Sequence, residues 1–583
     1  MLAPQSNPFR QSVDLSGLWE FRPDPQDQGQ DAGWRQGFSG RPIGAPASWN
    51  DQIPELRDFL GPAWYSTRFH RPWGWEGRRV ALHFASVNYL AHVWLNGVHL
   101  GHHEGGHLPF QFDITPHLQE DNLLVVRVDG RLARDRVPPG QVEDPLDSHQ
   151  IGILPPATFD FFPFCGIQRP VHLVATAPVS LADLTVTTGI QGRTGLVQVQ
   201  AALQGGAGGL RFTLAGQGAR WVTEIPSGGS PQGELAIPEA RLWSPETPHL
   251  YALTVELLDG RRVVDRYQLP VGIRTVAVEG DRLLLNGEPV VLRGFGRHED
   301  FPVVGRGFLP PVMVKDQALL AWIGANSFRT SHYPYAEEEL HLADRLGFLV
   351  IDETPAVGLF FQEEGLERRL ALCRQFTQEL IARDKNHPSV IAWSLANEPR
   401  SLRPAAVPFF RELYRLARSL DPTRPITIVS DLATQEESFD FFDLVCLNLY
   451  RGWYQESGRL EEGFAAFASI LDETHARFGK PILVTEFGAD AIPGHHALPP
   501  EMFSEEYQAA FLQGYVQVME ARPFVAGQHV WNLCDFKTAQ GVKRPMALNF
   551  KGVFTRDRRP KLAAHRLRAL WKKGERRRTG EQG

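Results

Sequence analysis

The pattern of hydrophobic and polar residues changes near residue 276. Before that point the chain carries short apolar runs separated by turn residues, such as residues 80–84 and 90–95. Asn96 and Gly97 follow the second run and are typical of a tight hairpin turn. We therefore predict an antiparallel β-sandwich of the jelly-roll type over residues 1–178.

A second all-β unit is predicted after residue 178. Residues 196–200 alternate between apolar and polar side chains, which is typical of a strand with one buried face. Asp259 and Gly260 lie between two further strand-like runs and can turn a hairpin. A span of about a hundred residues suits an immunoglobulin-like β-sandwich, which we expect over residues 179–275.

From residue 276 onward, apolar runs alternate with amphipathic helical segments, for example residues 312–322, 336–346 and 366–383. Eight strand-helix units within about 300 residues predict a (β/α)₈ TIM barrel, whose strands are buried on both faces. We place this barrel at residues 276–575. The eight candidate strands are residues 291–296, 325–331, 348–353, 389–397, 425–431, 444–450, 481–486 and 525–532.

Length and composition agree with several folded domains. The chain has 583 residues, of which 43% are hydrophobic and 22% charged, so it can form more than one core. Its formal net charge is −7, and its densest basic run lies at residues 572–578, beside the C-terminus. A solvated basic tail at residues 576–583 explains this run better than nucleic-acid binding, which needs a basic face on a folded module.

Cysteine use and hydropathy indicate the compartment. The four cysteines are widely spaced, which favours reduced thiols over a zinc site or a disulfide framework. No apolar stretch reaches the length of a membrane span, and residues 1–10 lack the pattern of a signal peptide. We expect a cytoplasmic protein with no membrane partner; a signal peptide already removed is the alternative.

Two glutamates stand where a barrel would place its chemistry, at the C-terminal ends of strands. Residues 391–396 lead into Asn397 and Glu398, and residues 482–485 lead into Glu486. Hydrolysis of a glycosidic bond with retention needs two carboxyl groups about 5 Å apart. Either glutamate alone could instead cap a strand or pair with an arginine, but the combination favours a retaining glycosidase.

Four motifs stand out in the barrel region: Gly294-Phe295-Gly296-Arg297-His298-Glu299-Asp300, Arg329-Thr330-Ser331-His332-Tyr333-Pro334, Asn397-Glu398-Pro399 and Thr485-Glu486-Phe487-Gly488. In these motifs, and over nearly its whole length, the chain resembles glycoside hydrolase family 2, and within it the bacterial β-glucuronidases. The resemblance implies a sugar-binding jelly roll, an immunoglobulin-like sandwich and a catalytic barrel, with no cofactor. It also implies exo-hydrolysis of terminal β-D-glucuronides by double displacement through a covalent glycosyl-enzyme intermediate.

The resemblance also implies roles for single residues. Glu398 would be the general acid/base and Glu486 the nucleophile. Asn397 would hydrogen-bond the sugar 2-hydroxyl, where contacts strengthen in the transition state. Asp160 would reach a sugar hydroxyl from the first domain. Further pocket positions are matched by His332, Asn448, Tyr450, Tyr454 and Trp531.

The expected substrate class depends on a separate motif. Asn549 and Lys551 resemble the Asn-x-Lys pair with which β-glucuronidases hold the C6 carboxylate, and Arg544 resembles an arginine just upstream. An anionic sugar that loses its water needs a fixed cation and neutral donors in exchange. We therefore expect a small-molecule or oligosaccharide glucuronide as substrate. We also expect the enzyme to be a homo-oligomer.

Other functions remain open at this stage. A β-galacturonidase would share the carboxylate site, a β-galactosidase would not, and a non-catalytic carbohydrate-binding protein would not need both glutamates. Two histidine groups, residues 102–107 and 495–496, could suggest a metal. Because neighbouring strand residues point to opposite faces, we expect no metal site there.

Overall fold

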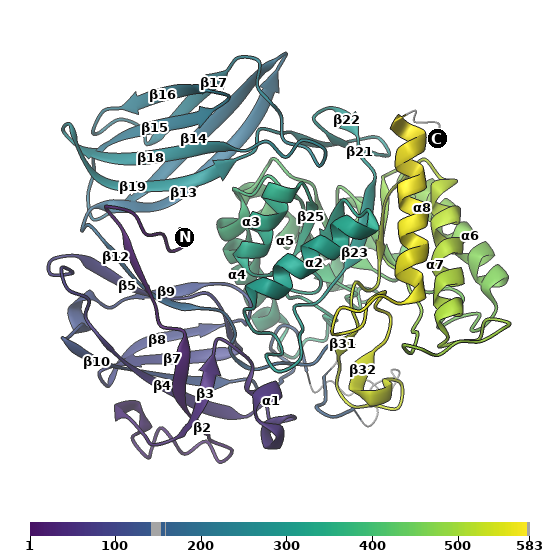
Figure 1. The fold of residues 1–583 in the computed structure, drawn as a ribbon, viewed down its shortest axis with the longest axis horizontal. Helices are drawn as coiled ribbons and strands as arrows, with labels where there is room; N and C mark the ends of the chain where they lie inside the picture. Colours follow the sequence, from purple (N-terminus) through teal and green to yellow (C-terminus); the bar gives the residue numbers. More distant parts are fainter. Residues whose placement is uncertain (141–152, 158, 580–583) are drawn as a thin grey trace.

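The structure is a computed structural model that describes residues 1–140, 153–157 and 159–579, with side chains described up to residue 572. It divides into two β-sandwiches and a barrel (Figure 1). The first sandwich packs a four-stranded sheet, β1-β12-β5-β9, against a six-stranded sheet, β3-β2-β4-β10-β7-β8. Its strands are β1 (Gln11–Asp14), β2 (Gly17–Pro23), β3 (Arg41–Ala45), β4 (Pro62–His70), β5 (Arg79–Phe84), β7 (Leu90–Leu95), β8 (Val98–Glu104), β9 (Phe110–Asp113), β10 (Asp121–Asp129) and β12 (Val171–Thr176), with the small pair β6 (Val87–Asn88) and β11 (Gly166–Ile167).

The core of this sandwich follows from alternation along its strands. On β10, Leu124, Val126 and Val128 point into the core between the sheets, whereas Val125 packs on the other face against a separate tryptophan cluster. The predicted hairpin joins β7 to β8, and both turn residues have positive φ, 52° at Asn96 and 81° at Gly97. This is the backbone geometry that an Asn-Gly turn favours, so the hairpin prediction is confirmed.

The second sandwich packs sheet β13-β14-β17 against sheet β16-β15-β18-β19. On β14, Val197 and Val199 are buried while Gln198 and Gln200 are exposed, as the alternation predicted. Gly260, at φ 61°, turns the chain from β18 into β19. The strands are β13 (Ser180–Gln191), β14 (Thr194–Gln204), β15 (Gly209–Gly216), β16 (Ala219–Ile225), β17 (Gln232–Ile237), β18 (Tyr251–Asp259) and β19 (Arg262–Val271).

The third unit is a closed barrel of parallel strands, β23 to β30, in which β23 pairs with both β24 and β30. Each of the eight predicted strands contains one observed strand, and the predicted fold class is confirmed. A small sheet, β20 (Val276–Glu279), β21 (Arg282–Leu285) and β22 (Glu288–Pro289), precedes it. The barrel strands are β23 (Leu292–Gly296), β24 (Ser327–Arg329), β25 (Leu349–Glu353), β26 (Val390–Asn397), β27 (Ile426–Ser430), β28 (Val445–Asn448), β29 (Ile482–Glu486) and β30 (Val525–Val530).

Helices surround the barrel and alternate with its strands (Figure 1). The helix that follows β23 has clear start and stop signals in its sequence. It begins with two prolines, and Gly324, with a φ of 89°, follows its last residue and terminates it. The α-helices are α1 (Trp49–Gln52, in the first sandwich), α2 (Pro310–Ile323), α3 (Glu337–Leu346), α4 (Leu366–Asp384), α5 (Ala406–Leu420), α6 (Leu460–Phe478), α7 (Glu505–Glu520) and α8 (Leu562–Thr579). The remaining elements are the 3-10 helices η1 (Trp34–Gln36), η2 (Pro54–Leu56), η3 (Thr115–His117), η5 (Ala433–Gln435), η6 (Glu437–Asp440) and η7 (Pro545–Ala547), and the strands β31 (Phe536–Lys537) and β32 (Leu548–Asn549).

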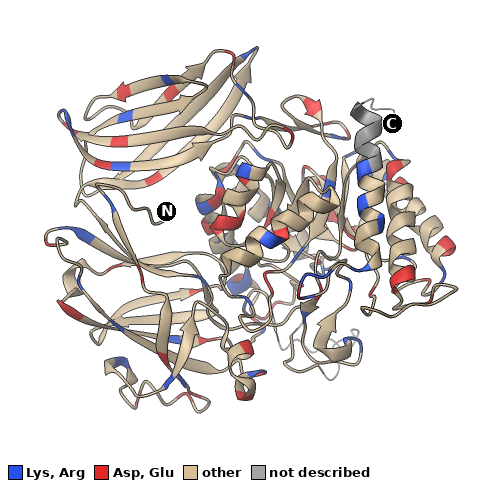
Figure 2. Cartoon of the chain, viewed as in Figure 1, with Lys and Arg blue, Asp and Glu red and all other residues tan. Residues whose placement is uncertain are grey.

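The division into domains stays our proposal. The boundary proposed after residue 178 falls between β12 and β13, and the one after residue 275 falls between β19 and β20. The expected basic tail, residues 576–583, begins within α8, and its last four residues lie outside the described part of the chain. Figure 2 shows acidic and basic residues interspersed over all three units. Among the described helices, none is long and apolar enough to cross a membrane.

The N-terminal segment connects the first sandwich to the second. Arg10 lies just before β1, and its guanidinium donates two hydrogen bonds to Asp265 on β19, at 2.9 and 2.6 Å. Both side chains are buried, at 5% and 0% exposure. A buried carboxylate that loses its cation is strongly destabilising, so this pair stabilises the junction of the two sandwiches.

We predict that Arg10→Ala lowers the free energy of unfolding by about 3 kcal/mol, because it leaves Asp265 buried without its cation. Urea unfolding followed by tryptophan fluorescence measures the change. The matched control is Arg193→Ala, which removes an exposed ion pair with Glu239 and should cost less than about 1 kcal/mol. Equal effects of the two variants would contradict a structural role for the Arg10–Asp265 pair.

Candidate active site

The C-terminal ends of the barrel strands meet around one buried arginine. Arg329, the last residue of β24, has a fully buried side chain. One guanidinium nitrogen, Nη1, donates to both carboxylate oxygens of Glu353 at 2.7 and 2.8 Å. The other, Nη2, donates to Oε1 of Glu486. Burial alone would raise the pKa of Glu353, but Arg329 outweighs it and the pKa lies below its ordinary value.

Glu486 is the last residue of β29 and lies against this cation. The Tyr450 hydroxyl donates a hydrogen bond of 2.6 Å to its other oxygen, Oε2. The Nε2 atom of His332 lies 3.5 Å from Oε1. A carboxylate held by a guanidinium and a hydroxyl in this way has a fixed position and a charge partner, which are the requirements of a nucleophile.

Glu398 follows the end of β26 and lies in a different electrostatic environment. The Asn448 amide donates to its Oε1 at 2.7 Å. Burial, and then the negative charge of Glu486, raise the pKa of Glu398 well above its ordinary value. Its φ of 45° is unusual for a residue other than glycine, and such strain is concentrated at functional sites. A neutral carboxyl group beside an ionised one can donate a proton.

Neighbouring side chains complete this part of the site. Asn397 is the last residue of β26, directly before Glu398, and its Oδ1 accepts from Asn448 Nδ2 at 3.2 Å. The rings of His332 and Trp531 stack with centroids 4.7 Å apart. Because these side chains are buried and come from four different strand ends, a ligand here would contact β24, β26, β28 and β30 together.

A second group of polar side chains lies beside the glutamates, on the loops after β28, β29 and β30. The ammonium of Lys551, which is 1% exposed, donates to the Tyr454 hydroxyl at 2.9 Å and to Asp490. The Arg544 guanidinium donates to Asp160 Oδ1 at 2.7 Å. The rings of Tyr450 and Tyr454 are 5.3 Å apart and connect this group to Glu486.

Asp160 ties the first domain to this group. It comes from the segment before β11, and its Oδ2 accepts from the Asn549 amide at 2.7 Å, in addition to the contacts with Arg544. Its side chain is 43% exposed. The structure therefore brings together all twelve residues that the sequence singled out: the glutamates with Asn397, Asn448, His332, Tyr450 and Trp531, and beside them Tyr454, Asp160, Arg544, Asn549 and Lys551.

The second group is balanced in charge. Burial alone would raise the pKa of Asp490, but Lys551 and then Arg544 outweigh it and lower the pKa below its ordinary value. Two cations, Lys551 and Arg544, thus face two carboxylates, Asp490 and Asp160. Asp490 thus gives the buried Lys551 a charge partner within the protein.

Three residues with evident roles were missed by the sequence reasoning: Arg329, Glu353 and Asp490. Arg329 stood in a quoted motif, and its position at a strand end was the available signal. Glu353 likewise ends an apolar run, as Glu398 and Glu486 do. Asp490 lies two residues beyond the Glu-Phe-Gly motif, in no recognisable pattern, and only its contacts identify it.

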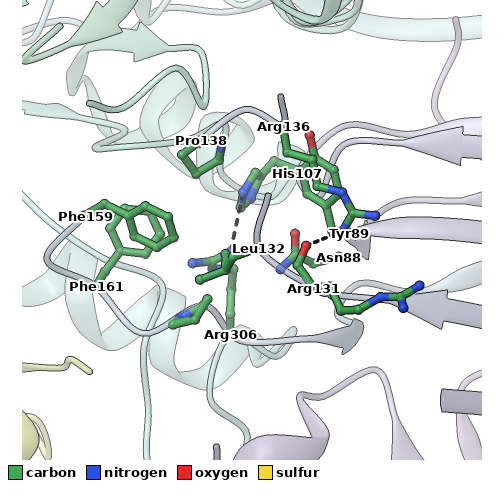
Figure 3. A pocket seen from close by; sticks show the side chains of 12 residues that line it. Asn88, Tyr89, His107, Arg131, Leu132, Arg136, Pro138, Phe159, Phe161 and Arg306 are labelled. Carbon is green, nitrogen blue, oxygen red and sulfur yellow. Dashed lines mark hydrogen bonds between the residues drawn. The ribbon is translucent and has the colours of Figure 1, made fainter. Parts of the chain in front are cut away.

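A pocket opens between the first domain and the barrel next to this site (Figure 3). Phe161 lines it and also packs against His332, with ring centroids 6.1 Å apart. Arg131, Arg136 and Arg306 lie in its wall as well. Phe161 and His332 therefore lie between this pocket and Glu486.

The histidine groups noted in the sequence have separate partners. His103 lies 3.1 Å from Glu379, and the His107 ring stacks on Tyr333. His496 lies 2.7 Å from Glu506. Each of these three side chains thus points to a neighbour of its own.

Comparison with known families assigns each part of the chain. Residues 13–177 match the sugar binding domain of glycosyl hydrolases family 2, and residues 178–274 match a further domain model of that family. Residues 276–575 match its TIM barrel domain.

Relatives of known activity match over the full length. A beta-glucuronidase of Paenibacillus borealis is 44% identical, with 98% of each chain covered, and the beta-glucuronidase of the dog is 40% identical, with 98% of this chain and 92% of the relative covered. The solved beta-D-glucuronidase of Dictyoglomus thermophilum superposes with a TM-score of 0.91 at 38% identity, covering 98% and 99% of the two chains. The structure of Ruminococcus gnavus beta-glucuronidase in complex with D-glucaro 1,5-lactone superposes with a TM-score of 0.92 at 37% identity. This match covers 98% of this chain and 99% of the other. The chain therefore belongs to glycoside hydrolase family 2.

Proposed function

We propose that this glycoside hydrolase is a retaining exo-β-glucuronidase. The observation that carries the proposal is the buried ammonium of Lys551 beside the two glutamates, with Asn549 and Arg544 around it. The C6 carboxylate of a glucuronide loses water on binding and needs such a cation nearby, whereas a neutral sugar does not. The activity named for the Paenibacillus and Dictyoglomus relatives supports the same substrate class.

In the first step Glu486 attacks the anomeric carbon, and the bond to the leaving oxygen breaks. Glu398 transfers its proton to that oxygen, so the alcohol departs neutral and Glu486 becomes a glycosyl ester. The raised pKa of Glu398 suits this step, because it favours the protonated form that a general acid needs.

In the second step the same glutamate acts as a base. Esterification removes the charge of Glu486, which is one of the causes that raise the pKa of Glu398, so this pKa falls. Glu398, now ionised, takes a proton from water as the water attacks the anomeric carbon and Glu486 leaves. Two inversions at one carbon give net retention.

Sugar recognition divides between the two groups of side chains. Asn397 is suited to the 2-hydroxyl, since it stands next to Glu398 on β26. Lys551 and Asn549 are suited to the carboxylate at the other end of the ring. Asp160 is suited to a sugar hydroxyl, because its side chain lies beside Arg544 and remains partly exposed to solvent, where a ligand can reach it.

The first prediction from this mechanism distinguishes the roles of the two glutamates by the stereochemistry of the product. Azide is small enough to occupy the space left by either truncated side chain. With Glu486→Ala it should attack the substrate directly and give the α-glucuronosyl azide. With Glu398→Ala it should attack the covalent intermediate and give the β-azide. NMR of the two products identifies each configuration, and the same configuration from both variants would refute the assigned roles.

The second prediction concerns Lys551 and the substrate carboxylate. Lys551→Met should lower kcat/KM on an aryl β-glucuronide about 10²-fold or more, because truncating one partner of a buried charge pair costs about 2–5 kcal/mol. Its slow hydrolysis of the matching β-glucoside should fall far less, since that sugar has no carboxylate and Arg544, 3.8 Å from Asp490, remains as the charge partner of that aspartate. Steady-state kinetics on both substrates measure the ratio.

Lys561→Met is the matched control for this variant. Lys561 is also buried, at 2% exposure, and donates to Asp535 at 2.8 Å. Its replacement should affect glucuronide and glucoside in parallel. A parallel loss with Lys551→Met would mean that Lys551 supports the structure and does not select the substrate.

A further inference from the structure

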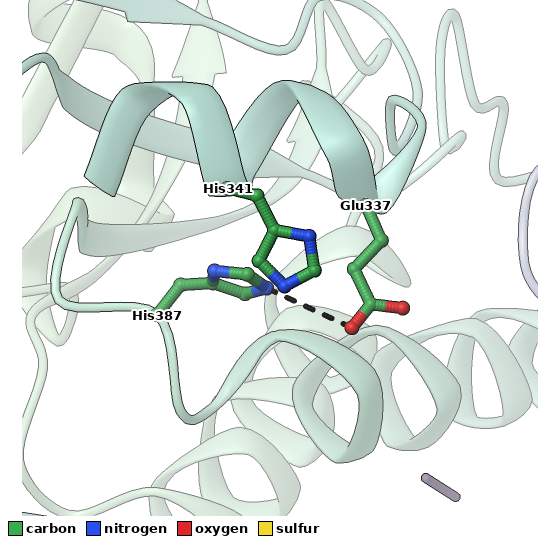
Figure 4. Close-up of side chains that lie close together, drawn as sticks. All are labelled: Glu337, His341 and His387. Atoms are coloured by element: carbon green, nitrogen blue, oxygen red, sulfur yellow. Dashed lines mark ion pairs between the residues drawn. The ribbon is translucent and has the colours of Figure 1, made fainter. Parts of the chain in front are cut away.

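Three potential metal ligands converge on the flank of the barrel. Glu337 and His341 lie one turn apart on α3, so their side chains share one face of the helix. His387 comes from the loop between α4 and β26 and points at both of them (Figure 4). One ligand atom from each of the three lies within 4.8 Å of the others.

A fourth residue fixes the histidine from the loop. Nδ1 of His387 lies 2.6 Å from Oδ2 of Asp344, whose other oxygen accepts from the backbone N–H of Ser389 at 3.0 Å. The opposite nitrogen, Nε2, faces Glu337 at 4.0 Å. Histidines that bind metals are oriented in this way, by a carboxylate on the nitrogen that does not bind.

The second histidine, His341, lies edge-on to His387, with ring centroids 4.9 Å apart. Within the described part of the chain, no hydrogen bond engages either of its ring nitrogens. A neutral imidazole with a free lone pair, a second imidazole and a carboxylate are the ligands that Zn²⁺ takes, with water in the fourth position.

We propose that Glu337, His341 and His387 form a binding site for a divalent transition-metal ion of the zinc type. At zinc-ligand distances of about 2.0–2.1 Å, the ligand atoms of a tetrahedral site lie about 3.4 Å apart, so the three groups must close in slightly. Glu337 can do so, because its side chain is 25% exposed and lies at the first turn of α3.

An ion bound at this position would affect the junction between the barrel and the second sandwich. The loop that carries His387 also contacts the second sandwich, where Asn386 accepts from Val186 N at 2.8 Å and donates to Leu184 O at 2.9 Å. A bound ion would tie the start of α3 to this loop. We therefore expect it to stabilise the junction of barrel and sandwich, and to leave the chemistry at the glutamates unchanged.

A proton is the competing occupant. Burial would lower the pKa of His387, but Asp344, Asp384 and Glu337 outweigh it and raise the pKa to about 9. A protonated His387 between Asp344 and Glu337 would satisfy the same carboxylates without a metal. The two states differ in metal content, which can be measured directly.

The test uses the full chain without a polyhistidine tag, stripped with EDTA and then dialysed against micromolar Zn²⁺. Elemental analysis should find one zinc per chain, and Tm should rise by about 2 °C or more over the stripped protein. His341→Gln and Glu337→Gln should each abolish the rise while keeping the Tm of the stripped protein. Using two variants keeps the test valid if one of them fails to fold.

His99→Asn/His102→Asn is the matched control. These residues form another histidine group, on β8 beside His92, with the His92 ring 5.6 Å from that of His99 and 5.3 Å from that of His102. The control should keep both the stoichiometric zinc and the rise in Tm. Zinc well below one per chain in the unaltered protein, or a Tm rise that survives His341→Gln, would overturn the proposal, as would loss of zinc in the control.

Discussion

The buried guanidinium of Arg329 is the interaction on which the site depends. It lies at the centre of the strand ends and contacts two carboxylates, Glu353 on one side and Glu486 on the other. Without this cation, three glutamates in a desolvated barrel mouth would repel one another and take up protons. With it, Glu486 has a charge partner, whereas Glu398 is left with burial and a negative neighbour. One arginine therefore makes two similar carboxyl groups chemically different.

The same principle of balanced buried charge extends to the proposed sugar-binding group and across domains. Lys551 and Arg544 are offset by Asp490 and Asp160, and Asp160 belongs to the first sandwich. The first domain thus supplies part of the site, and the position of the domains matters for binding. At the junction of the two sandwiches, the buried Arg10 is likewise paired with a buried carboxylate, that of Asp265.

Much of this structure could be predicted from the sequence, for a physical reason. Parallel barrel strands are buried on both faces, so each leaves a continuous apolar run, and the polar residue that ends the run marks the site. Glu398 and Glu486 were found in this way. Asp490 could not be, because its role comes from contact with Lys551, 61 residues away along the chain. Pairing between distant loops leaves no local pattern, and the approach of His387 to Glu337 and His341 on α3 is likewise a contact between distant segments.

The central claim is that the charge of Glu486 raises the pKa of Glu398. The most direct test is carbon NMR of the side-chain carboxyl of Glu398 in protein labelled at glutamate, with its signal assigned by its loss in Glu398→Gln. In the unaltered protein this carboxyl should titrate well above the ordinary range, because of burial and then Glu486. In Glu486→Gln its pKa should fall, since burial remains but the negative charge is gone. An unchanged pKa in that variant would contradict the account.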